Sequence, residues 1–133
     1  MARRVLVIGY GNPGRLDDGL GPACADAIRE RAIPGVTAES DYQLVVEEAA
    51  AVAEHDSVVF VDAALDGPEP FEWRPVPPAC PAGLGTHTLD PGAVIELAQL
   101  AFGARPEAWI LAIRGYDFNA FGERLSAAAR KNL

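Results

Sequence analysis

Three short apolar runs constrain the fold of this chain more than any other feature of its sequence. They lie within residues 5–8, 57–62 and 109–113, and each is rich in aliphatic and β-branched side chains. A continuous apolar run of this length, without polar alternation, is typical of a strand buried on both faces. Such strands form the centre of parallel sheets, so we expect parallel central strands at these three places.

Helical patterns alternate with these runs, and this order predicts an α/β fold with helices on both faces of the sheet. Pro22 opens the first helix, because proline suits the first helical turn, and Pro34 ends it. Asp90 is the expected N-cap of a later helix. The expected helices span residues 22–34, 44–54, 91–102 and 123–132, and two further strands span 36–42 and 71–76. The alternating pattern of the last strand predicts an antiparallel edge strand.

Length and composition limit the class of protein. The 133 residues fit one domain, residues 1–133, with a core of its own. A net charge of −8 disfavours nucleic-acid binding, which needs a basic face. Cys24 and Cys80 form no disulfide framework, and no apolar run is long enough for a signal peptide or a membrane span. We therefore expect a cytoplasmic protein that binds neither nucleic acid nor membrane.

Residues 9–14 follow the first expected strand and match the dinucleotide-binding pattern GxGxxG. In proteins that bind dinucleotides, the helix begins within the glycine motif and its free N–H groups hold the pyrophosphate. Here no helix is expected before Pro22, and Pro13 removes one amide donor from the loop. Asp17 and Asp18 would also place negative charges near the phosphates. NAD or FAD binding is therefore the less favoured hypothesis.

The same loop is better suited to hold carboxylates than phosphates. Gly9, Gly11 and Gly14 permit tight turns and positive φ angles. Asp17 and Asp18 follow within a few residues. Two interpretations remain open: the aspartates cap the following helix and complement its dipole, or they contribute to a functional site.

Two further groups can meet these aspartates. Asp62 ends the strongest buried strand, at the sheet edge where ligand sites form in such folds, although a simple turn residue would also fit there. His87 lies in a loop rich in glycine and proline, where an exposed histidine is the alternative. His55 lies at the opposite edge, and we expect a structural role for it. Asp18, Asp62 and His87 together would form an open site for nickel, zinc, iron or manganese.

The motifs resemble those of the hydrogenase maturation proteases. The pattern GxGNxxxxDDGxG spans residues 9–21, and VFVDA at 59–63 and HTL at 87–89 follow it. The resemblance covers nearly the whole chain. These proteins are endopeptidases that remove a C-terminal extension from the large subunit of nickel–iron hydrogenases. The resemblance implies a three-layer α/β/α sandwich around a mixed sheet of about five strands, with one antiparallel edge strand.

The resemblance also implies roles for particular residues. Asp18, Asp62 and His87 would be the metal-binding and catalytic residues. Gly9, Gly11, Asn12 and Asp17 would support their loop. Nickel would be supplied by the substrate, a large-subunit precursor, and another divalent metal could occupy the isolated protein. We expect the protease itself to be a monomer.

The chemistry and the activity have alternatives that the sequence leaves open. The metal can polarise the scissile carbonyl or activate water, or a carboxylate can act as general base. Asp18 and Asp62 could also share a proton as a metal-independent dyad. A non-enzymatic accessory protein that binds nickel or the precursor would use the same residues. The segment 114–116 would either contact the extension or form an exposed loop.

Overall fold

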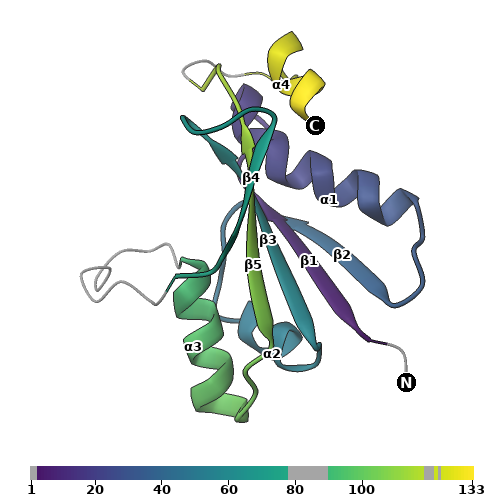
Figure 1. The fold of residues 1–133 in the computed structure, drawn as a ribbon, viewed down its shortest axis with the longest axis vertical. Coiled ribbons are helices and arrows are strands. Elements are labelled where there is room, and N and C mark those ends of the chain that lie inside the picture. The colour runs from purple at the N-terminus through teal and green to yellow at the C-terminus, as the bar shows by residue number, and fades with distance from the viewer. Residues whose placement is uncertain (1–2, 78–89, 119–121, 123) are drawn as a thin grey trace.

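The computed structural model describes residues 3–77, 90–118, 122 and 124–133 (Figure 1). A five-stranded sheet forms its centre, as the sequence predicts, and its strand order is β2-β1-β3-β5-β4. The strands are β1 (Val5–Tyr10), β2 (Val36–Asp41), β3 (Ser57–Ala64), β4 (Phe71–Pro75) and β5 (Glu107–Arg114). The helices are α1 (Leu20–Glu30), α2 (Glu48–Ala53), α3 (Pro91–Phe102) and α4 (Ala127–Asn132), with a 3-10 helix, η1 (Leu16–Gly19), before α1.

Four of the strands are parallel, and β4 is the antiparallel edge strand expected over 71–76. β1 pairs in parallel with β2 and β3, and β3 pairs in parallel with β5. β4 runs antiparallel along β5, with Arg74 opposite Ile110. The carboxyl ends of β1, β3 and β5 therefore lie side by side at one edge of the sheet, where a ligand site is expected.

The helices cover both faces of the sheet and make three layers (Figure 1). Along β3, Val58 and Phe60 face a cluster that includes α2 and α3, whereas Val61 faces α1. This alternation follows from the two-residue period of a strand. Both faces carry fully buried side chains, which explains why the sequence of β3 is almost continuously apolar. The three-layer α/β/α sandwich is confirmed.

Helix boundaries differ from those expected from the sequence. α1 begins at Leu20, so the prediction that Pro22 opens the helix is wrong. Pro22 occupies the third position, still within the first turn, where a missing N–H costs no hydrogen bond. α2 begins at Glu48 rather than at residue 44, and α4 begins at Ala127 rather than at residue 123. The N-cap of α3 is confirmed, because Asp90 accepts a hydrogen bond from the backbone N–H of Ala93 at 2.7 Å.

Asp17 is fully buried and joins the loop before α1 to the segment after β5. Its carboxylate accepts hydrogen bonds from the backbone N–H groups of Tyr116 (2.7 Å) and Asp117 (2.9 Å). It also accepts from the backbone N–H and the hydroxyl of Ser126, both at 2.7 Å. The interpretation of Asp17 as the cap of α1 is wrong, since the N-cap of α1 is Gly19 and carries no side-chain cap.

Removing the negative charge of Asp17 should destabilise the fold. In Asp17→Asn, an amide NH₂ would face N–H groups that now donate to the carboxylate, and we expect the free energy of unfolding to fall by about 3 kcal/mol. Asp26→Asn is the matched control, because Asp26 forms an exposed ion pair with Arg29 on α1. That control should change stability by less than about 0.5 kcal/mol. Urea unfolding measures both, and equal effects would contradict the role of Asp17.

Candidate functional site

The loop after β1 brings Asp18 to the carboxyl end of the sheet. Gly11 has a φ of +142°, and a Cβ atom there would lie 2.1 Å from the carbonyl oxygen of Asp18. Gly9 serves close packing instead, because its Cβ atom would lie 2.0 Å from the carbonyl oxygen of Gly21 on α1. Of the three motif glycines that permit a positive φ, only Gly11 adopts one. Glycine therefore lets both the loop and α1 approach β1.

Hydrogen bonds within this loop orient Asp18 and occupy the donors that a nucleotide would need. The backbone N–H of Asn12 donates to Oδ2 of Asp18 at 2.8 Å. The backbone N–H of Gly14 donates to Oδ1 of Asn12 at 2.8 Å, and that of Arg15 donates to the carbonyl of Asn12 at 3.0 Å. These amides cannot also hold a pyrophosphate, so the geometry disfavours the dinucleotide hypothesis.

Asp62 lies near the carboxyl end of β3 and shares one electrostatic environment with Asp18. The pKa of Asp62 is raised from 3.8 to about 6, chiefly by burial and also by the nearby Asp18 carboxylate. The N–H of Ala63, which donates to Oδ1 at 2.8 Å, the hydroxyl of Tyr10 and the guanidinium of Arg74 act in the opposite direction. Burial and Asp62 together raise the pKa of Tyr10 well above its usual range. The raising effects outweigh the lowering ones, so the pKa of Asp62 stays about two units above that of an exposed aspartate.

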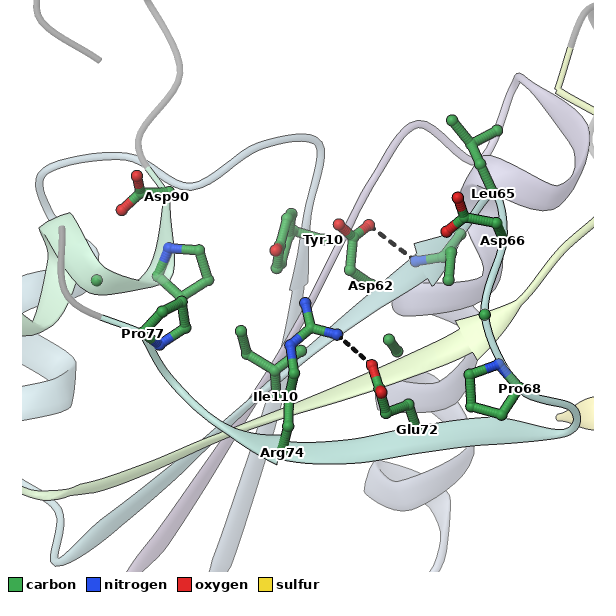
Figure 2. Close-up of a pocket in the computed structure, with 16 residues that line it drawn as sticks. Tyr10, Asp62, Leu65, Asp66, Pro68, Glu72, Arg74, Pro77, Asp90 and Ile110 are labelled. Carbon is green, nitrogen blue, oxygen red and sulfur yellow. Dashed lines mark hydrogen bonds and ion pairs between the residues drawn. The ribbon is translucent and has the colours of Figure 1, made fainter. Parts of the chain in front are cut away.

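A pocket of about 560 Å³ opens beside Asp62 (Figure 2). The first turn of α3, the loop between β3 and β4, and the inner faces of β4 and β5 form its walls. The guanidinium of Arg74 points from β4 toward Tyr10 and Asp62 and forms an ion pair with Glu72 at 2.6 Å (Figure 2). The polar residues that line the pocket are Tyr10, Asp62, Asp66, Glu72, Arg74 and Asp90. The pocket is open to solvent and strongly acidic.

Asp18 lies close enough to Asp62 for its carboxylate to raise the pKa of Asp62, whereas His87 lies outside the described residues, as does Cys80. Within the described parts of the chain, no group of three or more His, Cys, Asp or Glu side chains is arranged to hold a metal ion. The role of His87 as a ligand thus stays a prediction. His55 precedes β3 at the opposite end of the sheet, where its Nδ1 donates to the carbonyl of Ala51 at 2.7 Å, as expected for a structural histidine.

The segment 114–116 is only partly an exposed loop, because Arg114 ends β5 and Gly115 is buried, whereas Tyr116 is exposed. Its contact with the extension stays a prediction. Arg114 donates to the carbonyl of Gly67 at 2.8 Å and lies 4.9 Å from the ring centre of Tyr116. The hydroxyl of Tyr116 in turn donates to Glu69. These contacts hold the loop between β3 and β4, which forms one wall of the pocket. Cys24 is half-buried against the apolar cluster beneath α1, as expected for a core side chain.

Sequence reasoning missed Tyr10, Glu72 and Arg74 as residues of the site. Tyr10 occupies a variable position of the glycine motif, and its place at the end of β1 was the available signal. Glu72 and Arg74 are polar residues of an alternating strand, which alone indicates only a solvated face. Their proximity to Asp62 depends on the sheet order, in which β5 separates β3 from β4.

Comparisons with solved structures identify proteins of the same fold. No protein-family model and no curated protein matches the chain. The NiFe hydrogenase maturation protease HycI of Thermococcus kodakarensis matches with a TM-score of 0.75 and 23% identity, over 98% of this chain and 85% of that one. The hydrogenase maturating endopeptidase HybD of Escherichia coli matches with a TM-score of 0.71 and 16% identity, over 96% and 83%.

A third structure, the hydrogenase 2 maturation peptidase of a Thaumarchaeota archaeon, matches with a TM-score of 0.66 and 19% identity, over 98% of this chain and 90% of that one. The resemblance expected from the sequence motifs is thus confirmed at the level of the fold.

In the described residues, none of the helices is long and apolar enough to span a membrane.

Neutralising Asp62 should stabilise the protein near neutral pH. Because folding raises the pKa of this carboxyl from 3.8 to about 6, its contribution to stability is present below about pH 4 and is lost as the pH rises through 6. Asp62→Asn should therefore match the wild type at about pH 4 and exceed its free energy of unfolding by about 2 kcal/mol at about pH 7.

Urea unfolding at the two pH values measures this difference. Asp66→Asn is the control, because Asp66 is an exposed aspartate on the neighbouring loop. It should leave the pH dependence of stability as in the wild type. A stability difference between Asp62→Asn and wild type that does not vary with pH would contradict the burial of a charged Asp62.

Proposed function

We propose that this chain is a hydrogenase maturation endopeptidase, a hydrolase that removes a C-terminal extension from the nickel-loaded large-subunit precursor of a nickel–iron hydrogenase. The observation that carries the proposal is the meeting of Asp18 and Asp62 beside an open pocket. The fold around them is shared with proteins described as hydrogenase maturation proteases. The sequence motif and the geometry support the same activity independently.

In this proposal, the metal is part of the substrate. Asp18 and Asp62 supply carboxylate oxygens, His87 would supply an imidazole nitrogen, and such a mixed set suits a divalent cation such as nickel. The precursor presents its own inserted nickel to these groups, so the protease recognises a loaded precursor. The protein acts in this proposal as a cytoplasmic monomer.

Hydrolysis requires a water molecule, the scissile carbonyl and a proton acceptor near Asp62. The water oxygen adds to the carbonyl carbon, the C–N bond breaks, and a proton passes to the departing amine. Two routes are compatible with the site: the substrate's nickel polarises the carbonyl, or a carboxylate takes the proton from water. With a pKa raised to about 6 by burial, Asp62 is suited to proton transfer near neutral pH.

The test is the intact mass of a large-subunit precursor before and after incubation with this protein, with and without nickel in the precursor. We expect the loaded precursor alone to lose a short C-terminal peptide. Cleavage of both forms would support the protease activity but exclude nickel as the recognition signal. It would favour the metal-independent mechanism, in which two carboxylates share a proton. A precursor that binds and keeps its mass would identify an accessory protein instead.

Replacing single ligands should abolish cleavage without unfolding the protein. Asp18→Asn and His87→Ala should each reduce the rate of cleavage by at least about 100-fold, since even groups that merely orient metal ligands contribute up to this factor. His55→Ala is the matched histidine control at the opposite end of the sheet and should cleave at the wild-type rate. Full activity in both Asp18→Asn and His87→Ala would refute the three-ligand site.

A further inference from the structure

Arg74 belongs to no ligand set, yet its guanidinium points into the pocket beside Asp62 (Figure 2). Four carboxylates line this pocket, those of Asp62, Asp66, Glu72 and Asp90. Among the lining residues that the structure describes, Arg74 is the one cation. Its side chain is 47% exposed, so a ligand in the pocket can reach it.

The position of the guanidinium follows from the edge strand. Glu72 and Arg74 are two residues apart on β4, so their side chains lie on the same face of the sheet, and they form an ion pair at 2.6 Å. A half-exposed pair of this kind contributes little to stability. The ion pair does orient the guanidinium. A guanidinium carries five N–H donors in a rigid fork, and one ion pair does not use them all. Glu72 therefore serves to aim Arg74 toward the site.

We propose that Arg74 binds the carbonyl oxygen of the scissile peptide bond and then the carboxylate that hydrolysis leaves at the new C-terminus of the large subunit. This inference rests on the proposed function and adds to it a residue that contacts the substrate. The planar fork of arginine matches a carboxylate, with two parallel N–H···O hydrogen bonds.

The charges of the pocket explain why such a residue is needed. When water adds to the carbonyl carbon, negative charge develops on the carbonyl oxygen, and after the C–N bond breaks a carboxylate remains. Neighbouring carboxylates repel both species. The guanidinium of Arg74 points toward Asp62 across the shared pocket, on the side where the proposed reaction would take place (Figure 2). Arg74 thus stabilises the charge that the acidic lining would oppose.

The first experiment measures binding of the product and does not depend on cleavage. The probes are two synthetic peptides with the C-terminal sequence of the mature large subunit, one with a free carboxylate and one with a C-terminal amide. Calorimetry should show that the wild type binds the acid at least about tenfold more tightly than the amide. Arg74→Gln should bind both alike, and Arg74→Lys should keep part of the preference. Equal binding by the wild type would overturn the inference, and so would an unchanged preference in Arg74→Gln.

The second experiment measures cleavage of the nickel-loaded precursor. Arg74→Gln should lower kcat by about 100-fold with little change in KM, as expected when one donor to a developing oxyanion is removed. Millimolar guanidinium should partly restore the rate of Arg74→Ala, which a structural role would not predict. The matched control is Arg29→Gln, because Arg29 forms a similar ion pair with Asp26 on α1 and is 53% exposed.

The outcomes separate this inference from the proposed function. A wild-type protein that leaves the loaded precursor intact would count against the endopeptidase activity. A wild-type protein that cleaves it, together with Arg74→Gln that cleaves equally fast, would count against Arg74 alone. Loss of activity in Arg74→Gln together with a lowered melting temperature and no rescue by guanidinium would assign Arg74 a structural role and overturn the inference.

Discussion

A single buried carboxylate holds the beginning and the end of the chain together at the edge of the sheet where the site lies. The groups that donate to Asp17 lie far along the chain: Tyr116 is 99 residues later and Ser126 is 109 residues later. Without this acceptor, the backbone N–H groups of the turn after β5 and of Ser126, the N-cap of α4, would lose their hydrogen-bond partner. A second link supports the first, since Leu16 donates its N–H to the carbonyl of Gly122 at 3.0 Å. Leu16 has a φ of +52°, a costly conformation for leucine, which these long-range contacts hold in place.

This constraint explains how two adjacent aspartates acquire opposite roles. Asp17 and Asp18 both lie in η1, and successive side chains of a 3-10 helix point about 120° apart. When Asp17 points into the core, Asp18 is turned toward the loop after β1, where the N–H of Asn12 fixes it. Asp17, which is held rigidly, therefore positions its neighbour Asp18, the proposed ligand, through the backbone that they share. The glycines of the motif complete the arrangement because they let the loop approach η1 and let α1 approach β1.

The sequence predicts those features that depend on local patterns and misses those that depend on register between distant segments. Apolar runs revealed the parallel strands, and the N-cap Asp90 revealed the start of α3, because each signal is contained in a few residues. The start of α1 was missed because its N-cap, Gly19, offers no side-chain signal. The sequence predicts Asp62 as a site residue from its place near a strand end, a rule of the fold class, although β3 continues to Ala64. Arg74 was not, because its proximity to Asp62 depends on the alignment of β4 with β5.

The electrostatics of the site fit the proposed substrate, which brings its own positive charge. Burial raises the pKa of Asp62 to about 6, so its ionised form costs free energy at neutral pH, and a cation bound beside it would offset this cost. In the proposed reaction, a precursor that carries nickel gains this favourable interaction, whereas a nickel-free precursor leaves the two carboxylates facing each other. The same acidity opposes the carboxylate product, which requires a cation on the pocket wall. Arg74 is suited to this because it is fixed by Glu72 on a strand and does not depend on the metal. In the proposed reaction, selection of the loaded precursor and stabilisation of the product would thus follow from one distribution of charge.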